Sequence, residues 1–443
     1  MTNTKSMPIA LIKAICLMLA LLTMQSCFGL PSSYSAQPGN AAKLMDIHGA
    51  GAQRSDPKTG DPAEYAGGHG PQGDVVRIYN AARAVRSLAE GPDGYPVVDT
   101  NQVLFYDNTT ETGQPAAGAD FFGQDAHYSG NTPGYIDNGD STVTDIVTGL
   151  TWQQDPGAKI SWSQAAQKVA QANAVKLAGY TDWRLPTIKE LYSLIDFSGL
   201  DVSPEANQSS NDTIPFIDPD YFTFSYGDTS TGDRIIDSQF ISATEYVSTT
   251  MGGNRTAFGV NFADGRIKGY PIGTTVGGAK TFYVLLVRGN SDYGKNNFVD
   301  NGDGTVSDLA TGLMWLQDDV LNVNWQQALA WAENLEYAGY ADWRLPNAKE
   351  LQSIVDYSRS PATSDSPAID PVFSCSEISD EGGRHNYAFY WTGTTHASSA
   401  ARVSGKAAVY VSFGEALGFF SAPGGSGPQA GLAPPQGLPA ALP

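Results

Sequence analysis

The sequence predicts an α+β fold built from two copies of one module. The phrase DNGDSTVTDIVTGLTW at 137–152 returns as DNGDGTVSDLATGLMW at 300–315, and GYTDWRLPTIKEL at 179–191 returns as GYADWRLPNAKEL at 339–351. A repeat of this length indicates a duplicated domain rather than a solenoid, whose repeats are tens of residues long. In each copy, segments with helical periodicity precede strand-like segments. Two helices followed by a twisted, mostly antiparallel sheet make an α+β module.

The first module is predicted to span 95–290 and the second 297–420. Each begins with a hairpin, because β-prone runs at 142–144 and 150–152 flank a turn. A helix then places one apolar face inward, formed by Trp162, Ala165, Ala166, Val169 and Ala172 in the first copy and by Trp325, Ala328, Leu329, Ala332 and Leu335 in the second. We expect the two copies to pack independently.

A second helix is predicted to begin after a proline in each copy. Thr187 with Glu190, and Asn347 with Glu350, have the spacing of an N-cap residue and its third-position partner. This capping position accounts for both glutamates better than a role as general acids. Strands follow, and YVSTT at 246–250 is aligned with WTGTT at 391–395.

One strand is missing from the second copy. The first copy closes with the apolar phrase TFYVLLVRGN at 281–290, and nothing similar follows Phe420. A related phrase, DVVRIYNAARAVRS, occurs instead at 74–87. We therefore predict that residues 44–90 supply the closing strand of the second module, as in a circular permutation. The alternative is that they are the remnant of an earlier, lost repeat.

The N-terminus predicts export. Residues 1–26 contain an early lysine and a short apolar run at 14–23, which is typical of a signal peptide and too short to span a bilayer as a helix. Ser26 and Cys27 resemble a bacterial lipoprotein signal, which implies lipidation of Cys27 and, with Phe28 next, the outer membrane. The alternative is ordinary cleavage nearby, giving a secreted or periplasmic protein. Residues 27–43 are predicted to form a tether, and 421–443 a disordered tail.

The charge limits the classes of partner. The chain of 443 residues has a formal net charge of -20, and removing residues 1–26 takes away two lysines and no acids. Such a surface repels phosphate backbones, so we expect no nucleic-acid partner. With Cys27 lipidated, Cys375 is the one remaining thiol, and no intramolecular disulfide is available.

The acidic turns are candidate metal sites. They offer oxygen ligands of the type calcium takes, although the spacing is not that of an EF-hand. Asn-Gly and Asp-Gly are also strong hairpin formers, so a turn without an ion is the other interpretation. The candidate ligands are Asp137, Asn138, Asp140 and Asp145, and Asp300, Asn301, Asp303 and Asp308.

Candidate ligand-binding residues follow from the aromatic pattern. Six of the eight tryptophans match across the copies and are interpreted as core, whereas Trp391 is the candidate for an exposed platform that stacks on a sugar or a protein. Thr394, His396 and Tyr246 lie in or beside the same aligned phrases and complete this predicted site. His396 is expected in a solvated loop. No pair of histidines has zinc-site spacing, and Cys375 is interpreted as a buried thiol rather than a nucleophile.

At DNGDGTVSDLATGLMW, GYADWRLPNAKEL and YWTGTTH the chain resembles the bacterial domain family named after the C-terminal domain of the Legionella collagen-like adhesin. The R-L-P phrase is also similar to formylglycine-generating enzymes, so the resemblance implies a C-type-lectin-like fold for each copy. For function it implies surface-exposed, often lipid-anchored proteins, one of which acts in adhesion and glycosaminoglycan binding. The acidic charge of this chain disfavours a sulfated glycan.

We therefore expect a non-enzymatic binding or adhesion protein of the cell surface or envelope. Its two lectin-like modules are expected to bind a glycan or a protein, and the lipid is expected to be its only attachment to the membrane. No cofactor is expected, with calcium as the candidate ion. One alternative is an enzyme related to the formylglycine-generating fold that uses Cys375 or a metal. The other is a purely structural envelope lipoprotein.

Overall fold

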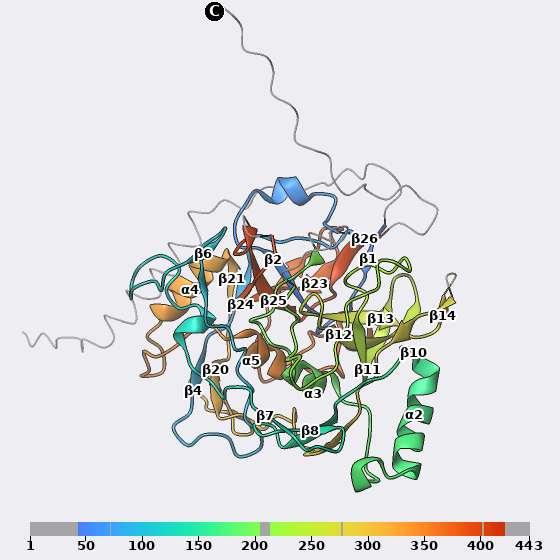
Figure 1. The fold of residues 1–443 in the computed structure, drawn as a ribbon. Helices are drawn as coiled ribbons and strands as arrows, with labels where there is room; N and C mark the ends of the chain where they lie inside the picture. Colours follow the sequence, from blue (N-terminus) through green and yellow to red (C-terminus); the bar gives the residue numbers. More distant parts are fainter. Residues whose placement is uncertain (1–42, 71, 204–212, 276–277, 401–402, 421–443) are drawn as a thin grey trace, which may run out of the picture. The chain divides into compact units, whose positions relative to one another are not determined.

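The computed structural model describes residues 43–70, 72–203, 213–275, 278–400 and 403–420 (Figure 1). The predicted signal peptide 1–26, Cys27, the tether up to residue 42 and the tail 421–443 lie outside these residues. The described residues belong to one compact unit. None of the helices among them is both long enough and apolar enough to cross a membrane.

Each copy contains a four-stranded antiparallel sheet built on the repeated phrase. Alternate side chains of these short strands point inward, so Val143 and Trp152 are fully buried in the first copy, as Val306 and Trp315 are in the second. The first sheet has the order β17-β9-β8-β7, with β7 Tyr135–Asp137, β8 Thr142–Asp145, β9 Leu150–Gln153 and β17 Val287–Gly289. The second has the order β4-β20-β19-β18, with β18 Phe298–Asp300, β19 Thr305–Asp308, β20 Leu313–Leu316 and β4 Val85–Ser87.

The strand β4 holds the place in the second copy that β17 holds in the first. Val287 is the partner of Trp152, and Val85 is the partner of the equivalent Trp315. The second copy thus receives this strand from the N-terminal side of the first copy. Further strands are added to the second copy in the same way, because residues before 90 pair with residues after 319 in four other strand pairs.

A second set of strands forms the other sheets. The first copy has the three-stranded sheet β11-β12-β13, formed by Gln239–Thr250, Asn254–Asn261 and Arg266–Pro271, and a pair β10 (Ile160–Ser161) with β16 (Thr281–Phe282). The second copy has the five-stranded order β2-β25-β24-β3-β21, formed by Gln53–Pro57, Ala407–Ser412, Phe389–His396, Asn80–Ala82 and Val320–Val323. The strands β1 (Lys43–Asp46) and β26 (Leu417–Phe420) pair with each other (Figure 1). Short pairs are β5 (Phe105–Tyr106) with β6 (Glu111–Thr112), β14 (Thr274–Thr275) with β15 (Gly278–Ala279), and β22 (Glu377–Ser379) with β23 (His385–Tyr387).

The α-helices are short. They are α2 Trp162–Ala174, α3 Ile188–Ser193, α4 Trp325–Glu333, α5 Ala348–Ser353 and α6 Pro361–Ser364, and single 3-10 turns lie at Pro62–Tyr65, Asp125–His127 and Leu177–Gly179. The predicted capping boxes of α3 and α5 are confirmed, with Thr187 and Asn347 as N-caps. On α2 the predicted apolar face is only partly correct, because Ala165 and Ala172 are buried but Ala166 is exposed.

The predicted fold class is wrong. The described part of the chain is mostly β, with many small sheets and five short helices, rather than two C-type-lectin-like α+β modules that each have two helices and one twisted sheet. The physical reason is that the strands divide among several small sheets. Some pair with sequence neighbours, as β11, β12 and β13 do, whereas others pair with distant segments, as β9 does with β17 and β20 with β4, so no single continuous sheet forms in each copy. The helices α3 and α5 are only six residues long each, so they contribute little to the helical content of the fold.

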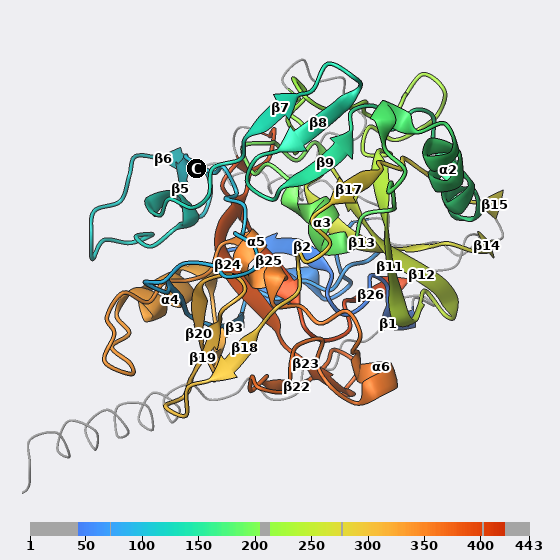
Figure 2. The same ribbon diagram turned by 90° about the horizontal axis from the view of Figure 1, so that it is seen from below.

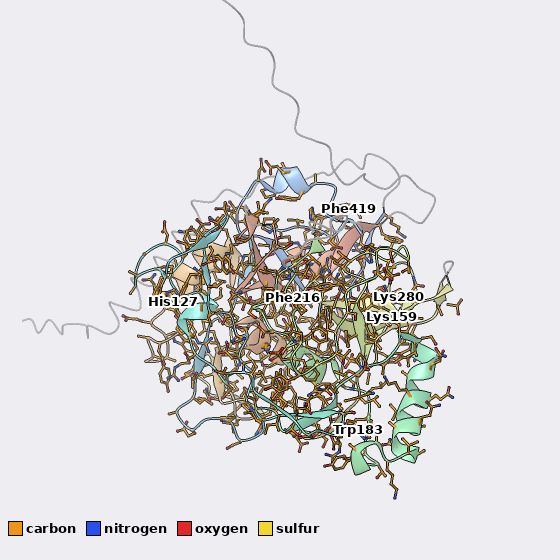
Figure 3. The ribbon with its side chains drawn as sticks, in the orientation of Figure 1. His127, Lys159, Trp183, Phe216, Lys280 and Phe419 are labelled. Carbon is orange, nitrogen blue, oxygen red and sulfur yellow. The ribbon has the colours of Figure 1, made fainter. Side chains whose placement is uncertain are left out.

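The two copies do not pack independently, contrary to expectation. One central apolar cluster contains Trp152 and Leu191 of the first copy together with Trp315 and Leu351 of the second, and each copy adds a smaller cluster of its own. Phe216 lies in the middle of the molecule (Figure 3) within this shared cluster. The helices α3 and α5 lie side by side at the junction (Figure 2).

A reciprocal exchange of lysines joins these helices. Lys189 of α3 donates from Nζ to the carbonyl of Ser353 at the end of α5, at 2.6 Å. Lys349 of α5 donates to the carbonyl of Ser193 at the end of α3, at 2.9 Å. Each lysine thus satisfies a carbonyl at the C-terminus of the other copy's helix, where positive charge is favourable. The two copies are thus joined by a pair of equivalent contacts, one made by each copy to the other.

Candidate functional site

The acidic turns are hydrogen-bonded hairpin turns. Asp137 Oδ1 accepts from the backbone N–H of Gly139 at 2.8 Å, and Asp140 Oδ1 accepts from Thr142 Oγ1 at 2.6 Å. The amide of Asn138 donates to Thr142 Oγ1 at 2.9 Å. The same bonds recur in the second turn, through Asp300, Asn301, Gly302, Asp303 and Thr305. These side chains act within their own turns, as the turn interpretation requires.

Asp145 and Asp308 lie apart from the turn tips, at the ends of β8 and β19. Asp145 Oδ1 accepts from the backbone N–H of Val147 at 2.9 Å, and burial raises the pKa of its carboxyl. Asp308 is fully buried and accepts from the N–H of Asn297 at 2.8 Å. Among the described residues, no group of three His, Cys, Asp or Glu side chains is placed so that it could hold a metal ion. Calcium binding stays a prediction.

Trp391 is not an exposed platform. Its side chain is 0 % exposed, and the indole Nε1 donates to the carbonyl of Val323 at 3.0 Å. Tyr246 is also buried, and its hydroxyl donates to Asp46 Oδ2 at 2.8 Å. The predicted exposure is therefore wrong, because β24 lies inside the five-stranded sheet with its end against the first copy, and Tyr246 of β11 packs against β1.

His396 is buried at the junction rather than solvated in a loop. Its ring stacks on Phe216 of the first copy at a centroid distance of 5.5 Å, and Nε2 lies 2.8 Å from the carbonyl oxygen of Asp264. Burial, with Arg266 nearby, lowers the pKa of His396 to about 4. The residue therefore stays neutral at physiological pH and serves the contact between the copies.

The structure also corrects the alignment of the two strands. The backbone N–H of Ala348 donates to Thr394 Oγ1 at 2.9 Å, and the N–H of Ile188 donates to Thr244 Oγ1 at 3.0 Å. Thr244, not a residue of 246–250, is therefore the counterpart of Thr394. Short repeats of threonine and serine fit several registers, and only these bonds to α3 and α5 decide between them.

A cleft of about 570 Å3 lies beside Thr244, between the copies. We call it the open cleft. Its walls come from the start of α3, from the connection between β17 and β18, and from the segment after α5. Its lining includes Arg184, Thr187, Thr244, Ser291, Tyr293 and Tyr357. Arg184 forms a two-bond ion pair with Glu190, as Arg344 does with Glu350 in the second copy, so these charges are already matched.

The corresponding place in the second copy is filled by the chain itself. Residues 99–128, which we call the plug segment, cover Thr394 and the edge of β24. Asp125 Oδ2 accepts from Thr394 Oγ1 at 2.6 Å and from Thr100 Oγ1 at 2.7 Å. The side-chain amide of Gln102 donates to the carbonyl of Thr395 at 2.7 Å and accepts from its N–H at 2.8 Å. These contacts bury both threonines completely.

The plug segment has a small core of its own. His127, which is labelled in Figure 3, packs between the rings of Phe105 and Phe122 at centroid distances of 4.6 and 4.5 Å. The segment belongs to the long connection 88–134 between β4 and β7, whereas the equivalent connection 290–297 between β17 and β18 is short. Asp125, Gln102 and Thr244 were not predicted as site residues. The unequal lengths of these connections are the one sequence signal that distinguishes the covered site from the open one.

Cys375 does not have the properties of a nucleophile. Burial raises the pKa of its thiol to about 12, although the hydroxyl of Tyr390 donates to the sulfur at 3.3 Å. A thiol with such a pKa is protonated at neutral pH, whereas catalysis requires the thiolate.

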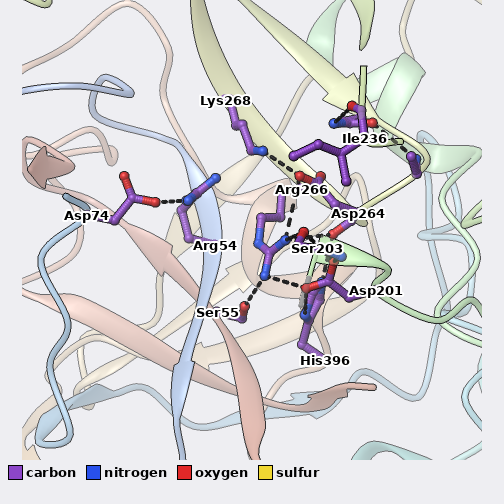
Figure 4. A network of polar contacts seen from close by, with 12 residues as sticks. Arg54, Ser55, Asp74, Asp201, Ser203, Ile236, Asp264, Arg266, Lys268 and His396 are labelled. Atoms are coloured by element: carbon purple, nitrogen blue, oxygen red, sulfur yellow. Dashed lines mark hydrogen bonds and ion pairs between the residues drawn. The ribbon is translucent and has the colours of Figure 1, made fainter. Parts of the chain in front are cut away.

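A buried polar network connects the copies elsewhere (Figure 4). Arg266 of β13 donates to Asp201 Oδ2 at 2.8 Å and to Ser55 Oγ of β2 at 3.0 Å. Asp264, in the turn before β13, accepts from Nζ of Lys268, which is also in β13. Burial alone would raise the pKa of Asp201, but Arg266 lowers it to about 2. Because its charges are paired and shielded from solvent, the network fits a structural role better than a binding role.

Three buried carboxyls are expected to make a contribution to stability that falls as the pH rises from 6.5 to 7.5. Burial raises the pKa of Asp46 and Asp125 to about 7 and of Asp56 to about 8. These carboxyls ionise near pH 4 when unfolded, so at intermediate pH the folded state holds protons that the unfolded chain has lost. Each contributes a slope of up to about 1.4 kcal/mol per pH unit. Calorimetric melting at three pH values measures it.

Other buried groups set the limits of this pH window. His48 and His396, with pKa lowered to about 4, oppose the trend most at the lower end of the window, where unfolded histidines are still partly protonated. Lysines whose pKa burial lowers oppose it as well, increasingly toward the upper end of the window; they are Lys58, Lys168, Lys189, Lys268 and Lys349. Asp125→Asn is expected to reduce the slope. An Asp125→Asn variant whose melting temperature changes with pH as the melting temperature of the parent does would contradict the prediction.

A family model described as the Lcl C-terminal domain matches the chain twice, over residues 141–288 and 304–424, which together are more than half of it. The comparisons with curated proteins and with solved structures found no match.

Proposed function

The chain belongs to the family of the Lcl C-terminal domain, of which it carries two copies, and from this premise we propose that it is an exported, non-enzymatic protein that binds a ligand in adhesion at the cell surface or envelope. The observation that carries the proposal is the open cleft beside Thr244. It is large enough for a side chain or a sugar ring, and residues of both copies line it. The raised pKa of Cys375 disfavours the thiol-enzyme alternative.

The ligand is proposed to be a glycan or a protein of a cell surface, and not nucleic acid, because of the net charge of -20. The test is binding of the intact protein to arrays of glycans and of surface proteins, at two salt concentrations, with calcium and with EDTA. Ser291→Trp, which fills the open cleft, is expected to reduce binding at least tenfold, roughly the effect of losing one good contact.

Ala166→Trp is the matched control, because Ala166 is exposed on α2 and does not line the cleft. It is expected to leave binding unchanged. Equal binding by the parent protein and Ser291→Trp would remove the open cleft from the function, and no binding on either array would reject the proposal. A requirement for calcium would show that the acidic turns, or another oxygen-rich site, hold an ion.

We further propose that Cys27 is lipidated and anchors the protein to the outer membrane. Cys27→Ser is then expected to move the protein from the membrane fraction to the soluble fraction, because a lipid-linked chain loses its anchor. Fractionation of cells followed by immunoblotting measures this. Cys375→Ser should stay with the membrane as the matched control. An unchanged distribution of Cys27→Ser would favour ordinary cleavage and a secreted or periplasmic protein.

A further inference from the structure

We propose that the open cleft of the first copy binds a polypeptide segment of a partner protein in the way that the second copy holds its own plug segment. The inference rests on the proposed function and specifies the ligand as protein rather than glycan. Its basis is the internal repeat: two equivalent surfaces exist, one covered by the plug segment and one that the described residues leave open.

The covered surface defines the chemistry of the occupant. A carboxylate, that of Asp125, accepts from the hydroxyl of Thr394. A side-chain amide, that of Gln102, forms two bonds with the backbone of Thr395 at the edge of β24. A Cβ added to Gly393 would lie only 3.1 Å from the backbone nitrogen of Asp125. The surface therefore holds a segment by one acidic side chain, one amide side chain and close approach of its backbone.

The open surface retains the matching groups. Thr244 accepts the helix N–H of Ile188 as Thr394 accepts that of Ala348, which leaves each hydroxyl proton for another acceptor. In the second copy that acceptor is Asp125, whereas Thr244 is only half-buried in the wall of the open cleft.

The backbone edge is also repeated. Glu245 pairs with Ala257 of β12 as Thr395 pairs with Ala408 of β25, so Glu245 holds the position whose backbone Gln102 binds in the second copy. The strand β11 is the edge of its sheet. Edge strands bind extended peptides through backbone groups, with side chains in flanking pockets giving specificity.

One difference between the two surfaces affects how closely the backbone of an occupant can approach. Ala243 of the first copy is the counterpart of Gly393 of the second. The N–H of Ala243 donates to the carbonyl of Pro186 before α3, and the N–H of Gly393 donates to the carbonyl of Pro346 before α5. Ala243 is exposed, whereas Gly393 is covered by the plug segment. The added methyl group requires the occupant's backbone to lie slightly farther away. This chain's own plug sequence is therefore a usable but imperfect probe for the open cleft.

The test uses the intact protein and a synthetic peptide of residues 99–128, with binding measured by calorimetry. We expect one peptide per chain, because the second site is already occupied by an intramolecular segment at high effective concentration. Asp125→Ala in the peptide and Thr244→Val in the protein should each weaken binding at least about tenfold, the effect of losing a hydrogen bond to a charged group. Ala243→Gly should tighten it, and Thr244→Ser should leave it unchanged.

Hydrogen exchange provides a second measurement that does not depend on the peptide. The backbone amide proton of Glu245 is expected to exchange quickly in the free protein. The backbone amide proton of Thr395 is expected to be protected, because it donates to the side-chain oxygen of Gln102. Equal protection of both amides would overturn the open edge. Peptide binding that is insensitive to Thr244→Val and to Asp125→Ala would overturn the proposed contacts.

The outcomes separate this inference from the proposed function. Glycan binding blocked by Ser291→Trp, without binding of the peptide or of any arrayed protein, would overturn the inference and leave the proposed function standing. Self-association of the full chain that Ser291→Trp abolishes would assign the cleft to a second copy of this chain and overturn the partner-protein assignment. Failure of both arrays and the peptide would reject the two together.

Discussion

Deletion of residues 44–90 is expected to abolish cooperative folding of the second copy. These residues supply β4 beside β20, β2 beside β25 and β3 beside β24. They also supply Arg83, which is fully buried and donates to the carbonyl of Leu316 at 2.7 Å. Without them the edges of β20 and β25 are open and their apolar faces meet water, so soluble, cooperatively melting protein should not be recovered.

A circular permutant is the control for this deletion. Lys43 and Phe420 are direct partners in the pairing of β1 with β26, so a loop of a few residues can join them. A chain that runs from 91 to 420, through such a loop, and then from 43 to 90 should fold with a melting temperature close to that of the parent. We propose on this basis that residues 44–90 complete the second copy. A deletion variant with unchanged melting, or a permutant that fails to fold, would contradict the proposal.

Arg266→Met is expected to destabilise the protein by about 3–5 kcal/mol, the usual loss when one partner of a buried ion pair is removed. The guanidinium is the partner of Asp201, and the two side chains are only 14 % and 6 % exposed (Figure 4). Its removal leaves a buried carboxylate without its cation, which costs more than the bond itself was worth. Chemical denaturation of the variant and the parent measures the difference.

Two further variants test the cause of that loss. Arg288→Met removes an ion pair whose partner, Asp182, is largely exposed, and should cost about 1 kcal/mol or less. Adding Asp201→Asn to Arg266→Met should recover part of the stability, because the uncompensated charge is gone. Equal losses for Arg266→Met and Arg288→Met would show that the buried network contributes no more than a surface pair.

The predictable part of the fold was local. Thr187 and Asn347 were identified as helix caps from the spacing to their glutamates, and the Asn-Gly and Asp-Gly steps identified hairpin turns, because these features depend on residues a few positions apart. The duplication was equally readable, and the family match over both copies confirms it. The overall class was not, because the partners of β2, β3 and β4 come from the other end of the chain.

The exposure of the candidate residues was predicted wrongly for a related reason. Trp391 and His396 have the residue types of a binding surface, but their exposure depends on what covers β24, and that is the first copy together with the plug segment. Thr244 is an ordinary threonine in a strand. Its significance comes from the covered counterpart Thr394, and the sequence alone does not choose this register over the others that fit.

The sequence by itself therefore determined that the chain is a tandem repeat, where its turns and helix starts lie, and that its surface is strongly acidic, since each follows from composition or from neighbouring residues. Only the tertiary structure decided which strands complete which copy and which of two equivalent threonines faces an open cleft. The physical reason is that pairing and burial are set by contacts between segments hundreds of residues apart, where one long connection covers a surface that one short connection leaves bare.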